Sequence, residues 1–192
     1  MTMAALVLAA GAGRRFGGDK LAAAFRGEPL IHHAIRAARA APVDRVLVVC
    51  PAHLAIGDWP GEPRVEALRI ASPEMSASLK RGIAALAGAD AVFVFLGDMP
   101  LVPPGIAGEL ATALKENFAA LPRCRGEPGH PVLLTARAFA AIETLTGDQG
   151  AGRLLKARMD IAFVDTADEG VLLDIDRAED IARLEHRGEA PS

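Results

Sequence analysis

The stretch AALVLAAGAGRRFGGDK, residues 4–20, decides the fold of this 192-residue chain. Its first seven residues are all apolar, which predicts a strand buried on both faces, as in a parallel sheet. Glycines follow at once, and they let backbone N–H groups approach an anion closely. Arg15 and Lys20 add the positive charge that a bound polyphosphate needs. A buried strand that leads into such a segment predicts a phosphate-binding loop at the carboxyl edge of a sheet.

Two commoner phosphate-binding motifs do not fit this segment. The dinucleotide fingerprint G-x-G-x-x-G needs a glycine at position 16, where the chain has Phe16. The P-loop pattern G-x-x-x-x-G-K-[ST] needs lysine at position 19 followed by Ser or Thr, but the residues are Asp19 and Lys20. A glycine-rich surface turn with solvated basic side chains is the alternative interpretation.

Apolar patterning along the rest of the chain predicts alternating strands and helices, which is typical of βαβ units and a doubly wound sheet. In the first half we expect strands over residues 4–10, 45–50, 66–71 and 91–96, and helices over 29–41 and 76–86. In the second half we expect strands over 131–135, 161–165 and 170–175, helices over 103–117, 136–145, 151–158 and 177–185, and a loop over 122–131. The expected fold is therefore a single-domain α/β fold with a Rossmann-like, doubly wound mixed sheet over residues 1–186, and residues 187–192 form a frayed tail.

Composition and charge exclude several classes of protein. Apolar residues make up 51% of the chain and charged residues 23%, which indicates a globular domain. The formal net charge of −3 provides no basic field to attract nucleic acid or an anionic membrane. Cys50 and Cys124 lie too far apart in the sequence for a zinc motif or a disulfide framework. No apolar run reaches the roughly 18 residues that span a bilayer, and the first residues make a poor signal peptide, so we expect a cytoplasmic protein.

A second cluster, Gly97-Asp98-Met99-Pro100, ends the most apolar of the expected strands. The carboxyl ends of parallel strands share one edge of a sheet, so we expect Asp98 to lie near the segment 11–20. A carboxylate opposite a phosphate-binding loop suits Mg²⁺ held together with substrate phosphates. A simple turn residue is the alternative for Asp98.

Two further carboxylates follow near the end of the chain. Asp174 and Asp176 would lie on the same face if the strand at 170–175 continued through them. Asp176 is therefore a candidate second metal ligand beside Asp98. Alternatively, Asp176 caps the final helix, and the two roles are compatible.

Two loops rich in glycine, residues 126–131 and 147–153, predict a shaped pocket near the active edge. In these loops His130, Asp148 and Arg153 are candidates for contact with a substrate, although a single histidine such as His130 is more often structural. Ser78 lies in a segment that opens a helix, where it could meet a ribose hydroxyl or serve in ordinary capping.

With these motifs the chain resembles the nucleotidyltransferases of molybdenum cofactor maturation, and the cytidylyltransferase branch most of all. Five stretches carry the resemblance: residues 8–20, close to the family pattern L-A-A-G-x-S-x-R-x-G-x-x-K, and then 76–82, 97–101, 129–131 with 147–151, and 174–180. The first stretch is shared with a wide superfamily that includes sugar-phosphate and methylerythritol-phosphate nucleotidyltransferases.

The resemblance implies a fold like that of the nucleotide-diphospho-sugar transferases and a reaction in which the terminal phosphate of molybdopterin attacks the α-phosphorus of CTP and releases pyrophosphate. It implies that Leu8, Ala9 and Ala10 contact the nucleobase through their backbone. It assigns Gly11, Gly13, Arg15 and Lys20 to the triphosphate, and Asp98 and Asp176 to Mg²⁺. Arg15, Lys20 and Asp98 are the implied catalytic residues, Ser78 joins the nucleotide site, and a client molybdoenzyme is an implied partner.

Several positions depart from the family pattern. Gly13 stands where serine is common, and Gly152 stands where the family has arginine, so that Arg153 comes one place late. The guanylyl branch has glycine at the position of Ala10, so this alanine favours CTP over GTP. Three other functions stay open: a guanylyltransferase, a cytidylyltransferase for another phosphate acceptor such as methylerythritol phosphate, and a non-catalytic chaperone of the molybdenum cofactor.

Overall fold

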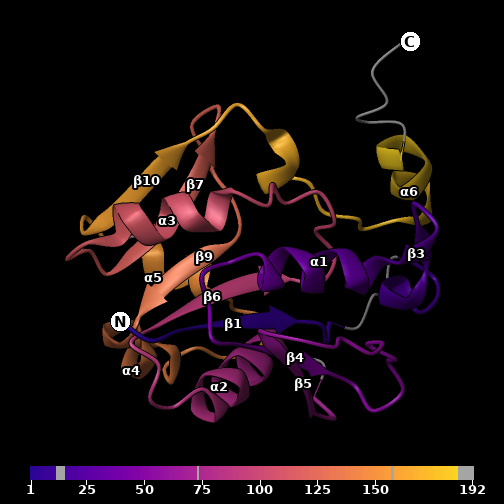
Figure 1. The fold of residues 1–192 in the computed structure, drawn as a ribbon, viewed down its shortest axis with the longest axis horizontal. Helices are drawn as coiled ribbons and strands as arrows, with labels where there is room; N and C mark the ends of the chain where they lie inside the picture. The colour runs from indigo at the N-terminus through magenta and orange to yellow at the C-terminus, as the bar shows by residue number, and fades with distance from the viewer. Residues whose placement is uncertain (12–15, 73, 157, 186–192) are drawn as a thin grey trace.

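The computed structural model, which describes residues 1–11, 16–72, 74–156 and 158–185, is a single α/β domain around one mixed sheet (Figure 1). The strands of this sheet are β1 (Met3–Leu8), β4 (Arg45–Cys50), β5 (Arg64–Arg69), β6 (Ala91–Leu96), β7 (Ala119–Cys124), β8 (Glu127–Pro128), β9 (Val132–Thr135) and β10 (Ile161–Asp165). Their order is β10-β7-β9-β6-β1-β4-β5, and β8 pairs with β7. Strands β2 (Ala24–Phe25) and β3 (Glu28–Pro29) form a separate antiparallel pair.

Strand β1 lies at the centre of a parallel block. It pairs with β4 on one side and β6 on the other, and β5 extends the block beyond β4. Strand β9 runs antiparallel between β6 and β7, while β10 pairs in parallel with β7. The mixed sheet that the sequence predicts is therefore confirmed.

Helices cover both faces of the sheet, so the core has two layers. Helices α1 (Leu30–Arg39), α3 (Ile106–Leu114) and α6 (Ala178–Glu185) pack on one face, where Ala5 and Val7 of β1 also point. Helices α2 (Met75–Ala85), α4 (Phe139–Ile142) and α5 (Ala151–Leu155) pack on the other face with Ala4 and Leu6. Figure 1 shows α1 and α2 on opposite sides of β1. This alternation explains why the first strand is apolar at every position.

The expected loop over residues 122–131 is wrong in part, because β7 and β8 form a hairpin there. Cys124 pairs with Glu127 across a two-residue turn in which both Arg125 and Gly126 have positive φ. Such turns match the twist of the flanking strands. Pro122 argued against a strand, but it is paired in register with Val164 of β10, and its carbonyl oxygen accepts a hydrogen bond from the Gly129 N–H at 2.9 Å.

The expected strand over residues 170–175 is also wrong. The chain forms a short 3₁₀-helix, η3 (Glu169–Val171), and then continues to residue 176 as neither helix nor strand, without joining the sheet. The reason is that its backbone bonds go to two different loops. The Val171 carbonyl oxygen accepts from the His130 N–H at 2.8 Å, and the Ile175 N–H donates to the Asp98 carbonyl oxygen at 2.9 Å.

The remaining elements differ from expectation mainly at their ends. The helix expected over 103–117 is shorter because β7 begins at Ala119, and the one expected over 136–145 is divided into η2 (Ala136–Ala138) and α4. A further 3₁₀-helix, η1 (Lys20–Ala22), follows the glycine-rich segment. None of the helices in the described ranges is long and apolar enough to cross a membrane. The expected tail at 187–192 lies outside the described residues.

Candidate functional site

The carboxyl ends of β1 and β6 are joined by backbone hydrogen bonds. The Gly97 N–H donates to the Leu8 carbonyl oxygen at 2.9 Å, and on the other side of β1 the Ala9 N–H donates to the Val49 carbonyl oxygen at 2.8 Å. A Cβ on Gly97 would lie 3.1 Å from that Leu8 oxygen and 3.0 Å from the buried Ile31 side chain. Glycine at this position therefore keeps the two strand ends close, and Asp98 follows directly.

Lys20 and Asp98 meet at this edge, as the sequence predicts for the segments 11–20 and 97–101. The Lys20 Nζ lies 2.7 Å from Asp98 Oδ2 and 3.5 Å from Asp176 Oδ1. The Lys20 side chain is only 11% exposed and that of Asp98 is 24% exposed, whereas Asp176 is 46% exposed. One partly buried cation therefore bridges two carboxylates that are 78 residues apart in the sequence.

Asp98, Asp174 and Asp176 together form a carboxylate cluster. One oxygen from each lies within 4.8 Å of the others. Burial, helped by the negative charges of Asp176 and Asp98, raises the pKa of Asp174 above its ordinary value. Three carboxylates facing one lysine leave an excess of negative charge, and hard oxygen ligands are what Mg²⁺ or Mn²⁺ prefers. The residues present fit a divalent cation.

Asp174 and Asp176 reach the cluster through loop packing, because the strand expected to carry them is absent. Their segment is held by the bond from Ile175 to Asp98 described above and by two glycines. A Cβ on Gly170 would overlap the carbonyl oxygen of Leu101, and one on Gly129 would overlap that of Val171. Only glycine allows these backbones to approach so closely.

Asp180 caps the backbone at the start of α6, while the capping role considered for Asp176 stays a prediction. The Asp180 carboxylate accepts hydrogen bonds from the N–H groups of Asp176 and Arg177, at 3.0 and 2.8 Å. These bonds lower the pKa of Asp180. The Asp180 side chain, in the first turn of α6, thus accepts hydrogen bonds from backbone N–H groups that precede the helix, as the acidic residue of a capping box does.

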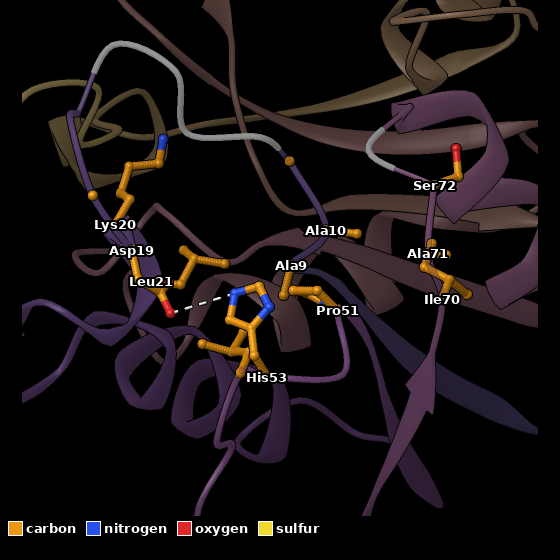
Figure 2. Close-up of a pocket in the computed structure, with 13 residues that line it drawn as sticks. Ala9, Ala10, Asp19, Lys20, Leu21, Pro51, His53, Ile70, Ala71 and Ser72 are labelled. Atoms are coloured by element: carbon orange, nitrogen blue, oxygen red, sulfur yellow. Dashed lines mark ion pairs between the residues drawn. The ribbon is translucent and has the colours of Figure 1, made fainter.

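Three cavities open at this edge of the sheet, and we name each after one residue. The Asp98 cavity, of about 100 Å³, is lined by Leu8, Ala9, Ala10, Gly11, Lys20, Leu21, Met75, Ser78, Leu96 and Asp98. The His53 cavity, of about 210 Å³, shares Ala9, Ala10, Gly11, Lys20 and Leu21 and adds Gly18, Asp19, Pro51, His53, Leu54, Ile70, Ala71 and Ser72 (Figure 2). The His130 cavity, of about 220 Å³, is lined by Leu96, Met99, Pro128, Gly129, His130, Val171, Leu172 and Asp174.

The structure brings most of the sequence-derived candidates together. Leu8, Ala9, Ala10, Gly11, Lys20, Ser78 and Asp98 all line the Asp98 cavity. The Ser78 hydroxyl donates to the carbonyl oxygen of Glu74, the residue that precedes α2, at 3.0 Å, so its proton is engaged. Gly13 and Arg15 lie outside the described residues.

The residues predicted to contact the acceptor substrate differ in whether they line a cavity. His130 lines its cavity beside Asp174, and its Nδ1 is buried with no hydrogen-bond partner among the described residues. Burial lowers the pKa of His130, although the Val94 carbonyl and the Asp98 charge oppose that shift. Asp148 and Arg153 are exposed and line none of the three cavities. Their loop nevertheless lies beside the start of α2, since the Ser76 N–H donates to the Gly147 carbonyl oxygen at 3.0 Å.

Sequence reasoning did not single out His53 or Met75. His53 comes three residues after β4, at the same sheet edge as Lys20 and Asp98. A rule that collects polar residues after every buried strand would have found it. Met75 carries no comparable signal, because an apolar residue at the start of a helix suggests core packing.

Glycine-rich backbone, a lysine and a carboxylate cluster at the carboxyl edge of a doubly wound sheet define a nucleotide-handling α/β domain. The profile of the MobA-like NTP transferase domain matches residues 5–162. The chain belongs to this family and is a nucleotidyltransferase, as the resemblance predicts, and the family uses nucleoside triphosphates.

Individual proteins agree with this assignment. The chain is 30% identical to the purine catabolism protein PucB of Bacillus subtilis over 187 residues, which cover 90% of this chain and 91% of PucB. It is 36% identical to a 2-C-methyl-D-erythritol 4-phosphate cytidylyltransferase of Cereibacter sphaeroides over 148 residues, 69% of this chain and 65% of that protein.

Solved structures share the fold. Rv0371c of Mycobacterium tuberculosis superposes with a TM-score of 0.82 at 24% identity, covering 96% of this chain and 97% of that one. Its complex with manganese superposes with a TM-score of 0.76 at 22% identity, covering 97% and 100%. The expected single-domain, nucleotide-diphospho-sugar-transferase-like fold is thus confirmed.

Proposed function

We propose that this nucleotidyltransferase moves the nucleoside monophosphate part of CTP onto the terminal phosphate of a molybdopterin-type acceptor and releases pyrophosphate. The observation that carries the proposal is the Lys20–Asp98 pair, 2.7 Å apart, on the wall of a cavity whose other side is the glycine-rich end of β1. A cation there binds phosphate oxygens, and a carboxylate there binds a metal that neutralises them. A non-catalytic chaperone would need neither group.

Mg²⁺ is the proposed metal, with Asp98 and Asp176 as ligands. Asp174 is the third oxygen donor of the cluster. When bound, the ion would withdraw charge from the α-phosphate and so stabilise the transition state. The manganese complex of Rv0371c, which shares this fold, supports the use of a divalent cation.

The chain contributes to this reaction mainly by positioning the substrate phosphates and by stabilising their negative charge. An oxygen of the acceptor phosphate forms a bond to the α-phosphorus, the bond from that phosphorus to the oxygen bridging to the β-phosphate breaks, and this oxygen leaves with pyrophosphate. Lys20, aided by Arg15, holds the negative charge that gathers on the leaving group. The backbone of Gly11 and Gly13 cradles the phosphates. No side chain acts as a nucleophile.

CTP is the proposed donor because Ala10 stands where the guanylyl branch has glycine. Ala10 lies on the wall shared by the Asp98 and His53 cavities. The cytidylyltransferase from Cereibacter sphaeroides supports the same base, since it is 36% identical to this chain over the matched residues. GTP is the alternative donor.

The His130 cavity is the proposed entrance for the acceptor. Leu96 belongs to both this cavity and the Asp98 cavity, so an acceptor in one lies next to a nucleotide in the other. Its lining combines the apolar side chains of Leu96, Met99 and Leu172 with exposed polar surface, and no Lys or Arg is among the described residues that line it. A flat heterocycle such as a pterin suits that lining, with His130 as a contact. Asp148, from the neighbouring loop, and Arg153, from α5, would contact the acceptor.

A second candidate acceptor is methylerythritol phosphate, which the similarity to the Cereibacter enzyme favours. That substrate is a polyol phosphate and would call for hydroxyl-binding and cationic groups in the acceptor cavity. The described lining of the His130 cavity has no Lys or Arg for such a phosphate, and its Leu and Met side chains suit a flat ring, which favours the pterin.

Pyrophosphate release tests the proposal directly. The protein is incubated with MgCl₂ and each of CTP, GTP, ATP and UTP, with molybdopterin or methylerythritol phosphate as acceptor. We expect release only with CTP and molybdopterin, and its loss in Lys20→Ala. Release with GTP alone would move the protein to guanylyl transfer, and release with methylerythritol phosphate alone would exclude the pterin. Molybdopterin binding without pyrophosphate release from any nucleotide would favour a chaperone that delivers the cofactor to a client molybdoenzyme.

A further inference from the structure

The His53 cavity lies next to the Asp98 cavity but extends away from the carboxylate cluster. The two cavities share Lys20, Leu21 and the Ala9–Gly11 backbone, so one elongated ligand can occupy both. Phosphates bound at Lys20 would leave the nucleoside part of the same molecule to fill the His53 cavity. Figure 2 shows Ile70, Ala71 and Ser72 across this cavity from Asp19 and Lys20.

His53 is a prominent polar side chain of this cavity. Its Nε2 lies 3.6 Å from Asp19 Oδ2, and its side chain is 70% exposed and therefore open to a ligand. Asp19 directly precedes Lys20 in the glycine-rich segment. The Asp19–His53 contact thus connects the phosphate-binding segment to the connection that follows β4 (Figure 2).

The turn that carries His53 is fixed on both sides by one guanidinium group. Nη1 of Arg69, at the end of β5, donates to the carbonyl oxygens of Pro51 and Leu54, at 2.8 and 2.6 Å, and lies 3.1 Å from Cys50 Sγ. The Leu54 side chain is 1% exposed, which anchors the turn in the core. His53 is therefore an exposed side chain on a rigid backbone, the arrangement that a binding residue needs.

We propose that His53 contacts the nucleoside part of the bound triphosphate, with Asp19 orienting its ring and Arg69 fixing its backbone. This inference rests on the proposed function, because it requires a nucleoside triphosphate with its phosphates at Lys20. It adds a side-chain contact to the backbone contacts with the nucleobase that the resemblance assigns to Leu8, Ala9 and Ala10.

Two probes separate a nucleoside contact from a phosphate contact. Isothermal titration calorimetry in MgCl₂ measures the affinity of CTP and of inorganic tripolyphosphate for the wild type, for His53→Ala and for Asp58→Ala. Asp58 is exposed in the same connection but does not line the cavity, so its variant is the matched control. We expect His53→Ala to weaken CTP binding about tenfold, as loss of one contact implies, and to leave tripolyphosphate binding within about twofold. Asp58→Ala should leave both affinities within about twofold.

Three results would overturn the inference. One is CTP affinity in His53→Ala equal to that of the wild type, and another is an equal loss for CTP and tripolyphosphate, which would assign His53 to the phosphates. The third is a loss of CTP affinity in the double variant Asp19→Asn, His53→Ala that equals the sum of the losses in the two single variants. Asp19 should act on CTP only through the His53 ring, so its replacement should add little once that ring is gone. In each case the wild type still binds CTP and the proposed function stands. Failure of the wild type to bind any nucleoside triphosphate would instead overturn the proposed function and this inference with it.

Discussion

Replacement of Gly170 by alanine tests how the carboxylate cluster is assembled. The added Cβ would overlap the Leu101 carbonyl oxygen and would lie 2.9 Å from its carbonyl carbon. Because backbone cannot move aside as a flexible side chain can, we expect a cost of about 1–3 kcal/mol. For a domain of this size that corresponds to a fall in Tm of roughly 2–12 °C. The displaced segment carries Asp174 and Asp176, so metal affinity and turnover should fall as well.

Gly108→Ala is the matched control, because it makes the same chemical change where there is room. Gly108 is exposed in α3, and no atom lies within 4 Å of a Cβ added there. Alanine in a helix interior should stabilise the fold by about 0.5–1 kcal/mol, a rise in Tm of roughly 1–4 °C. Thermal unfolding of both variants, together with pyrophosphate release, provides the comparison. A Gly170→Ala protein as stable and as active as the wild type would refute the packing of η3 against Leu101 as the support of the cluster.

Three other perturbations probe the site and the fold. Asp98→Asn should slow pyrophosphate release by about 10²–10³-fold or more with little change in Tm, and near-normal turnover would contradict the proposed mechanism. Mn²⁺ at about 100 times its Kd should stabilise the fold by about 2.7 kcal/mol, measured as a rise in Tm that EDTA reverses and that Asp174→Asn reduces; an equal rise in that variant would exclude Asp174 as a ligand. Glu28→Gln should cost up to about 1 kcal/mol near neutral pH, because the Arg36 guanidinium lowers the pKa of Glu28 and the charged form then stabilises the fold. The stability difference between the wild type and Glu28→Gln is fully present above the ordinary pKa of 4.5, and it shrinks as the pH falls through the lowered pKa of Glu28 in the folded protein. A difference in Tm that grew in acid would contradict this expectation.

The sequence predicted well wherever a segment's own pattern decides its structure. Six apolar residues in a row identify β6, and glycines directly after an apolar run mark the end of β1. Both signals are local, because a strand buried on two faces must be apolar throughout. The proximity of Lys20 and Asp98 follows from the sequence as well, since parallel strands bring their carboxyl ends to one edge.

Prediction failed where a segment's partners lie elsewhere in the chain. The pattern of residues 170–175 fits a strand, yet these residues bond to two separate loops and join no sheet. The proline at position 122 favours a loop, but β10 supplies a parallel neighbour that makes residues 119–124 a strand. The place of His53 after a buried strand is a weak local signal, but its contacts depend on Arg69 and Asp19 from two other segments.

By itself, the sequence determined the doubly wound sheet, the glycine-rich strand end, and the presence of Lys20 and Asp98 at one edge. These follow from local patterning and from the geometry common to all parallel sheets. The sequence offered Asp176 as a partner of Asp98, but only the tertiary structure decided that Asp174 joins them and that His53 faces the glycine-rich segment. Each of these contacts depends on close backbone approaches or single hydrogen bonds between distant segments, and residue order alone carries no information on such distances.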